Sequence, residues 1–288
     1  MAIFVQPMRN GDWLYEAPLA QGLQAAQLGV SSRHWVSYPA QPVAGEPPAQ
    51  RMRRLRIDVL PITQQAEAYV LQYYATAVFG DYSTVQQHNV QFSDTLQATT
   101  GLRELIHRFA RQERHFFFLT FENRVTGLVT QADLNRRPVS GYLYNLLCEA
   151  ELRLAAFIYQ QLTEERLLAF LETERQTTVS SNRQRILTEV LEQFRHDQQS
   201  GLDTRLTEYL YFTDLLEIIQ AHDLHRKLGY SSNQFEKLGS LNEMRNVVAH
   251  PVRSLVTHED TVARLDRRLH RLEELLFSLR NVRSWLAG

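Results

Sequence analysis

The chain has 288 residues, of which 44% are hydrophobic and 22% are charged, and 31 basic residues nearly balance 32 acidic ones. This composition is typical of folded globular proteins and excludes intrinsic disorder, a collagen-like repeat and a strongly basic nucleic-acid coat protein. The single cysteine, Cys148, excludes an intrachain disulfide. No apolar run is long enough to span a bilayer, and the N-terminus lacks the order of a signal peptide, so we expect a soluble cytoplasmic protein without a membrane segment.

The N-terminal part of the sequence predicts a mixture of strands and helices. A short apolar start at residues 3–5 and a helix-like stretch at 19–28 precede a proline-rich segment, 37–50, which predicts a loop or linker. A basic run at residues 51–56 follows, and residues 62–78 predict a helix. Beyond it, strands are predicted at 88–92, 115–121 and 125–130, with helices at 93–112 and from Asp133 onward.

From Gly141 onward the pattern is helical throughout. Apolar residues recur at three- and four-residue steps in a first helix (Leu143, Leu147, Ala150, Leu154, Ile158, Leu162) and in the last one (Val262, Leu265, Leu269, Leu272, Leu276, Leu279). The last stripe favours bundle packing, with a dimer seam as the alternative. We therefore predict an α+β fold: an N-terminal segment at 1–50, an α/β domain at 51–140 and a helical bundle at 141–288.

The junction at Thr130 and Asp133 has the chemistry of a nucleotide site. A strand that ends where a helix begins leaves backbone N–H groups unpaired, and these groups suit an anion. Thr130 offers a hydroxyl, Asp133 a carboxylate for ribose hydroxyls, and Gly127 a close approach of the backbone. Arg136 and its neighbour Arg137 would supply phosphate contacts.

This stretch resembles the cystathionine-beta-synthase (CBS) domain, whose junction has the form Gly, two apolar residues, Thr, two further residues, Asp and an apolar residue. The resemblance covers about residues 88–140, and it implies that Thr130 and Asp133 contact the ribose or phosphates of an adenine nucleotide effector. Such domains work as pairs. Residues 1–86 are the candidate for a degenerate partner, and pairing between chains is the alternative. A structural or dimerising role for this half remains open beside ligand sensing.

A second motif, LNEMRNVVAHP at residues 241–251, combines an arginine, an amide and an imidazole. Asn246 and His250 are four residues apart and share a helix face, and Pro251 is expected to place His250 at the end of the helix. A histidine titrates in the right range to move protons in metal-free RNA cleavage, while Arg245 can stabilise the charge that develops on the phosphate. Ser240 and Glu243 predict a capping box for this helix.

The motif and the helical stretch around it, about residues 141–283, resemble the HEPN domain, and the surrounding residues are closest to its Swt1-like branch of RNA endonucleases. The resemblance implies a bundle that dimerises so that two motifs line one cleft. It also implies a metal-independent ribonuclease, catalysis without a cofactor, and a setting in toxin–antitoxin or phage-defence systems. An acidic residue of the first helix in that family would correspond to Glu149 or Glu151.

These observations predict a homodimeric endoribonuclease that cleaves RNA and is regulated by an adenine nucleotide. The rival interpretation is a non-catalytic sensor or adaptor in which Arg245 and His250 form a structural pair and the bundle recruits a partner protein. A further alternative is one half of a toxin–antitoxin pair, with an antitoxin as the partner. His222 and His225 are spaced for a metal but have no convincing third ligand, so no metal site is expected.

Overall fold

The computed structural model describes residues 22–39, 45–63, 70–78, 80–202, 204–250 and 252–285, so the apolar start expected at 3–5 lies outside the described residues. The chain divides into two compact units. The first consists of residues 1–142 and 254–266, and the second of residues 143–253 and 267–288. The mixed α+β class predicted from the sequence is confirmed, because the strands precede a mainly helical region. Residues 254–266, which the sequence alone assigned to the bundle, belong to the first unit.

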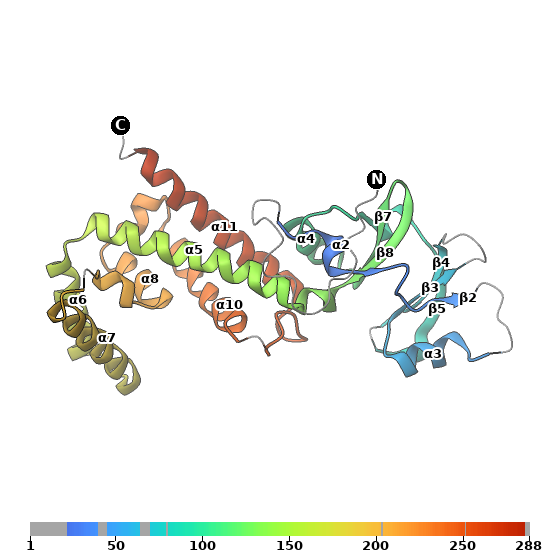
Figure 1. The fold of residues 1–288 in the computed structure, drawn as a ribbon, viewed down its shortest axis with the longest axis horizontal. Coiled ribbons are helices and arrows are strands. Elements are labelled where there is room, and N and C mark those ends of the chain that lie inside the picture. Colours follow the sequence, from blue (N-terminus) through green and yellow to red (C-terminus); the bar gives the residue numbers. More distant parts are fainter. Residues whose placement is uncertain are drawn as a thin grey trace. The chain divides into compact units, whose positions relative to one another are not determined.

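The first unit contains two four-stranded sheets, with the strand orders β2-β3-β4-β5 and β6-β7-β8-β1 (Figure 1). The first sheet comprises β2 (Tyr38–Pro39), β3 (Val59–Thr63), β4 (Val70–Thr76) and β5 (Val85–Asn89). The second comprises β6 (Thr95–Gln97), β7 (Phe116–Phe121), β8 (Arg124–Thr130) and β1 (Val30–Ser31). The described helices of this unit include α2 (Ala25–Leu28), α3 (Pro48–Leu55) and α4 (Leu102–Gln112).

The two sheets share one topology. In each, a strand is followed by a helix, by a parallel strand and by an antiparallel strand: β2-α3-β3-β4 in one sheet and β6-α4-β7-β8 in the other. Parallel neighbours need a crossover connection, and α3 and α4 supply it. A fourth strand then pairs antiparallel with the last one, β5 on β4 and β1 on β8. The first unit is therefore a structural repeat that periodicity in the sequence did not reveal.

Aromatic residues of β7 join the sheets to each other and to α4. Successive side chains of a strand point to opposite faces. Phe116 and Phe118 accordingly lie against Tyr73 of the other sheet, with ring centroids 5.3 and 5.2 Å away, whereas Phe117 contacts Phe109 of α4 at 5.0 Å. The run of three phenylalanines thus fills two hydrophobic layers.

One helix prediction for this unit is wrong, and a second has the wrong start. Residues 62–78 contain the end of β3 and all of β4, while 64–69 and 79 lie outside the described residues. In β4, Tyr73 and Ala75 are buried while Leu71 is exposed, which is the pattern of a half-buried strand. In the second region, residues 93–112, the helix begins only at Leu102, because β6 pairs with β7 first and Gly101 precedes the helix. The strand expected at 88–92 is β5, which begins earlier, at Val85.

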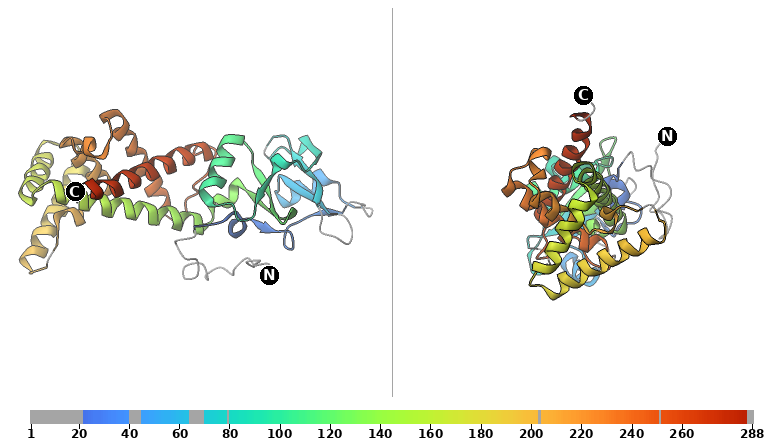
Figure 2. Two further views of the ribbon diagram at one scale, coloured as in Figure 1. Left: turned by 90° about the horizontal axis from the view of Figure 1, so that it is seen from above. Right: turned by 90° about the vertical axis from the view of Figure 1, so that its left-hand side faces the viewer.

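The second unit is built around α5 (Arg137–Gln161) and α11 (Val262–Trp285), both of which begin within the first unit. Their parts in the second unit run side by side (Figures 1 and 2), and Glu149 of α5 pairs with Arg280 of α11 at 2.8 Å. Every residue of the two predicted leucine-rich stripes is at most 7% exposed, which confirms both stripes. None of the described helices has the length and apolar character needed to cross a bilayer.

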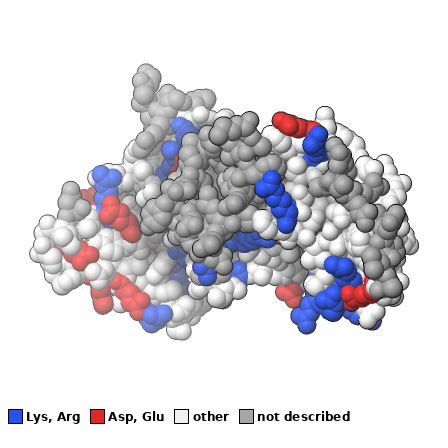
Figure 3. Space-filling model, turned by 45° about the vertical axis from the view of Figure 1, so that its right-hand side comes forward, with Lys and Arg blue, Asp and Glu red and all other residues white. Residues whose placement is uncertain are grey.

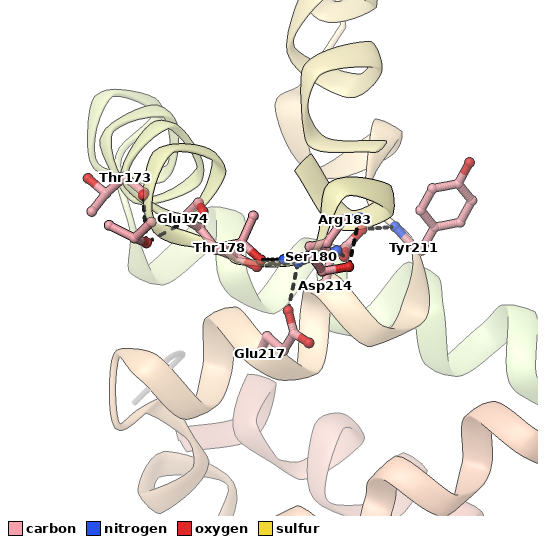
Figure 4. Close-up of polar contacts among 9 residues, drawn as sticks. Thr173, Glu174, Thr178, Ser180, Arg183, Tyr211, Asp214 and Glu217 are labelled. Atoms are coloured by element: carbon pink, nitrogen blue, oxygen red, sulfur yellow. Dashed lines mark hydrogen bonds and ion pairs between the residues drawn. The ribbon is translucent and has the colours of Figure 1, made fainter. Parts of the chain in front are cut away.

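The remaining helices of this unit are α6 (Glu164–Thr177), α7 (Ser181–Gln199), α8 (Phe212–Ala221), α9 (Ser232–Glu236) and α10 (Ser240–Val248). One arginine connects α6, α7 and α8 (Figure 4). Arg183 at the start of α7 donates to Glu174 of α6 at 2.8 Å, to Glu217 of α8 at 2.6 Å, and to Asp214 of α8. The Asp214 side chain is fully buried, and it also accepts from the Tyr211 N–H at 2.7 Å. The ion pairs of Arg183, one of them with a buried carboxylate, therefore connect the three helices.

The segment 254–266 is tied to the rest of the first unit by polar contacts. The Asn135 side chain donates to the Val256 carbonyl at 3.0 Å and accepts from the Val256 N–H at 2.7 Å. Asp266 pairs with Arg103 of α4, and its carboxylate also lies 3.4 Å from His107. Leu255 is buried. This segment follows shortly after His250 in the chain and is a structural part of the first unit.

Candidate functional site

The Arg–Asn–His motif lies at the C-terminal end of α10. Arg245 and Asn246 belong to the helix, and His250 follows just after it, where its N–H donates to the Val247 carbonyl at 3.1 Å. Leu241, Met244 and Val248 bury the opposite face. The side chains of Asn246 and His250 are exposed, and Arg245 is partly exposed. The structure thus presents the three motif residues away from the core, as a site for a ligand requires.

The capping box predicted for α10 is absent. Ser240 is the first residue of the helix rather than its cap, and its hydroxyl donates to the Lys237 carbonyl at 2.8 Å. Glu243 pairs instead with Arg268 of α11, whose side chain is 6% exposed. The Glu243 carboxylate, which the sequence pattern predicted to cap the backbone of α10, therefore pairs with Arg268 instead. This ion pair connects α10 to α11.

Arg245 has an acidic neighbour from α5. Its Nε donates to Glu151 Oε1 at 3.4 Å, and both side chains are about one-third exposed, at 32% and 27%. Of the two acidic candidates named from the sequence, Glu151 contacts the motif, whereas Glu149 pairs with Arg153 and Arg280. No described residue bonds the terminal Nη1 and Nη2 atoms of Arg245. The carboxylate therefore orients the guanidinium through Nε and leaves its planar fork available for an anion.

Two further residues of α5, which the sequence analysis did not select as part of a site, lie beside this pair. A hydrogen bond between the Tyr144 hydroxyl and the Cys148 thiol raises the pKa of Tyr144. The negative charge of Glu151 raises the pKa further, and the positive charge of Arg245 opposes it. Tyr144, Cys148 and Glu151 are separated by four and then three residues, so one face of α5 presents all three. That spacing was the only feature of the sequence that could have placed Tyr144 and Cys148 near the candidate site.

The candidate nucleotide residues are engaged with one another. Asp133 Oδ2 accepts from the N–H and the hydroxyl of Thr130 at 2.8 and 2.9 Å, and Oδ1 pairs with Arg136 at 2.7 Å. These contacts close the 3₁₀ turn η3 (Gln131–Asn135), so the helix expected from Asp133 instead begins at Arg137, as α5. The structure thus brings three of the four predicted ligand residues together at the end of β8.

Gly127, the fourth, contributes to strand packing. It pairs with Ser31 of β1, and a Cβ atom at this position would lie 2.8 Å from the Val30 carbonyl oxygen. That distance is too short for any side chain. The close approach at Gly127 is therefore made by β1, and the ligand contact predicted for this residue stays a prediction.

Other candidate features are less organised. Among the described residues, no group of three or more His, Cys, Asp or Glu side chains has the arrangement of a metal site. In the basic run that follows the proline-rich segment, Arg54 pairs with Glu46 at 2.7 Å. On the face shown in Figure 3, described basic side chains are scattered, and some of them lie beside acidic ones. The α10 motif and the β8 turn therefore remain as the two candidate sites.

A scan against models of known protein families finds no match to this chain, and a search of curated proteins finds no matching sequence. Function is therefore argued from the residues and their geometry.

Proposed function

We propose that this chain is a metal-independent endoribonuclease with Arg245, Asn246 and His250 as its catalytic residues. The observation that carries the proposal is the arrangement at the end of α10, where an exposed imidazole follows an arginine oriented by Glu151. Arginine with an open planar fork suits a phosphodiester, and an exposed histidine can exchange protons with solvent and substrate. The proposal agrees with the HEPN resemblance of residues 141–283.

The chemistry assigned to the site is transesterification. The RNA 2′-oxygen attacks the adjacent phosphorus as a base removes its proton, and the 5′-oxygen leaves as an acid protonates it. The products are a 2′,3′-cyclic phosphate and a 5′-hydroxyl. His250 acts as base or acid, Arg245 stabilises the charge on the phosphate oxygens, and Asn246 orients the reacting group. Because one histidine cannot easily fill both proton-transfer roles, a homodimer would supply the second from another copy.

We propose further that an adenine nucleotide regulates the enzyme by binding at the turn after β8. Support comes from Thr130, Asp133 and Arg136, which are gathered there, and from the strand-helix-strand-strand order of both sheets, which fits a pair of CBS-like halves. A carboxylate has about four acceptor positions, and Asp133 uses three of them within the protein. One position therefore remains for a ribose hydroxyl.

The decisive experiment is cleavage of labelled single-stranded RNA in excess EDTA. The wild-type chain should generate 2′,3′-cyclic phosphate ends, and His250→Ala should abolish them. His258→Ala is the matched control, because His258 is an exposed histidine only eight residues further along the chain and should not be required. Equal cleavage by wild type and His250→Ala would remove His250 from the mechanism.

The alternative function is a non-catalytic nucleotide sensor or adaptor that recruits a protein partner such as an antitoxin. The mutual contacts of Arg245 and Glu151 are compatible with this structural role. In that case neither the wild-type chain nor His250→Ala would cleave RNA, even with a panel of nucleotides present. ATP, AMP or a cyclic nucleotide would still raise the melting temperature of the wild-type chain, and Asp133→Ala would eliminate the shift.

A further inference from the structure

An exposed aromatic ring lies next to the proposed catalytic arginine. Tyr144 is 44% exposed, although its neighbours on α5, Leu143 and Leu147, are buried. It lies two turns before Glu151 on the same face of α5, and Glu151 pairs with Arg245 at 3.4 Å. The ring therefore belongs to the surface of the candidate site and contributes little to the core.

The ring of Tyr144 is available for a ligand. Among the described residues, no aromatic or cationic side chain stacks on it. By contrast, Tyr159 on the same helix has a similar exposure of 45%, and its ring is covered by the Arg205 guanidinium at 4.3 Å. A tyrosine side chain is uncharged near neutral pH and therefore does not repel a phosphate.

We infer that Tyr144 is a nucleobase-binding residue, whose ring stacks on an unpaired base next to the phosphate bound by Arg245. Proteins bind single-stranded nucleic acid by combining a cation for the backbone with an aromatic ring for the base. Arg245 and Tyr144 supply these two groups at one place. The inference rests on the proposed function, and it defines the substrate class as single-stranded RNA with an unstacked base beside the scissile phosphate.

The test measures RNA binding separately from cleavage. Full-length protein carrying His250→Ala is titrated against a short single-stranded RNA that contains 2-aminopurine, whose fluorescence falls when it stacks. Adding Tyr144→Ala should weaken binding at least about five-fold and remove the quenching, since base–aromatic stacking contributes about 1–3 kcal/mol per base. Tyr144→Phe, which keeps the ring, should bind and quench like the parent. Tyr159→Ala, the matched control on α5, should also match the parent.

Several results would overturn the inference. They are unchanged binding by Tyr144→Ala, equal losses in the Ala and Phe variants, a change in oligomeric state that accounts for the loss, or no RNA binding by any of these proteins. Failure of the proposed function has a different signature. If wild type does not cleave RNA but the binding pattern is as expected, catalysis is refuted and the base-binding role stands. If wild type cleaves and Tyr144→Ala leaves KM unchanged, the base-binding role is refuted and catalysis stands.

Discussion

Replacing Arg183 with alanine should destabilise the helical unit more than any exposed charge on the same helix. The Asp214 side chain is fully buried and pairs with Arg183, whose own side chain is 19% exposed. Removing one partner of a buried pair costs about 3–5 kcal/mol, because the other charge is left uncompensated. Asp214 would keep its bond from the Tyr211 N–H, which places the expected loss near the lower limit, at about 3 kcal/mol. For a chain of this size, that corresponds to a fall in melting temperature of about 6–12 °C.

The assay is urea unfolding followed by helical circular dichroism, with Arg185→Ala as the matched control. Arg185 is also on α7, but it is 62% exposed and pairs with the exposed Glu189, so its replacement should cost less than about 0.5 kcal/mol. Adding Asp214→Asn to Arg183→Ala should restore part of the stability, because it removes the uncompensated charge and keeps an acceptor. In the wild-type background, the same Asp214→Asn change should destabilise. Equal losses for Arg183→Ala and Arg185→Ala, or no recovery in the double variant, would refute this account.

Three further outcomes are expected from variants of the full chain, each measured by chemical unfolding. Asp133→Ala should lower the free energy of unfolding by about 2 kcal/mol, because the N–H and the hydroxyl of Thr130 lose their acceptor. Asp133→Asn keeps an acceptor and should cost less than about 1 kcal/mol, so equal losses would contradict the capping role. Gly127→Ala should destabilise by about 1–3 kcal/mol because its Cβ would collide with the Val30 carbonyl, and a neutral effect would disprove this steric argument. Gly141→Ala, at an open helical position of α5, should instead stabilise by about 0.5–1 kcal/mol. The hydrogen bond from Arg280 lowers the pKa of Glu149 below its ordinary value of 4.5, so the stability from this carboxylate is present above that value and is lost as the pH falls through the lowered pKa. Glu149→Gln should therefore be less stable than wild type near neutral pH and approach it in acid. A stability difference that persists in acid would contradict this role of the carboxylate.

Long helices were predictable from the sequence because their burial repeats with the helical period. The stripes of α5 and α11 extend over several turns, and a helix must bury such a stripe wherever it is placed. The hairpin of β7 and β8 was predictable for a similar reason. Its aromatic run is followed by Glu122 and Asn123, two residues that adopt positive φ in the turn. In these segments, local pattern and tertiary packing favour the same structure.

The sequence suggested the repeat in the first unit only through residues 1–86 as a candidate degenerate partner, and its strands were not predictable because their determinants are non-local. The helix predicted at 62–78 is replaced by strands whose partners are distant, such as Tyr73 beside Phe116 and Phe118. Short strands such as β2 and β6 have too few residues for a periodic signal, and only pairing with β3 and β7 defines them. Local propensity is a weak guide where such contacts determine the outcome.

The candidate site shows the same division. Its motif residues are close in the chain and were identified together, and their place at the end of α10 follows from the residues around them. The identity of the acidic neighbour was not determined, because Glu149 and Glu151 are equivalent in sequence terms and only α10 distinguishes them. Tyr144 was missed because an exposed tyrosine on a helix becomes informative only when its neighbour across the bundle is known to be Arg245.

The discontinuous first unit has a consequence for how the chain folds during synthesis. N-terminal units usually fold first as they leave the ribosome. Here the sheets emerge early, but Leu255, Val256 and Asp266, which complete this unit, emerge only after most of the second unit. A fragment that ends at residue 142 would leave the Asn135 amide without Val256, and it would represent the sheets without their final contacts. The contacts that complete the first unit therefore become available only after residues 254–266 have been synthesised.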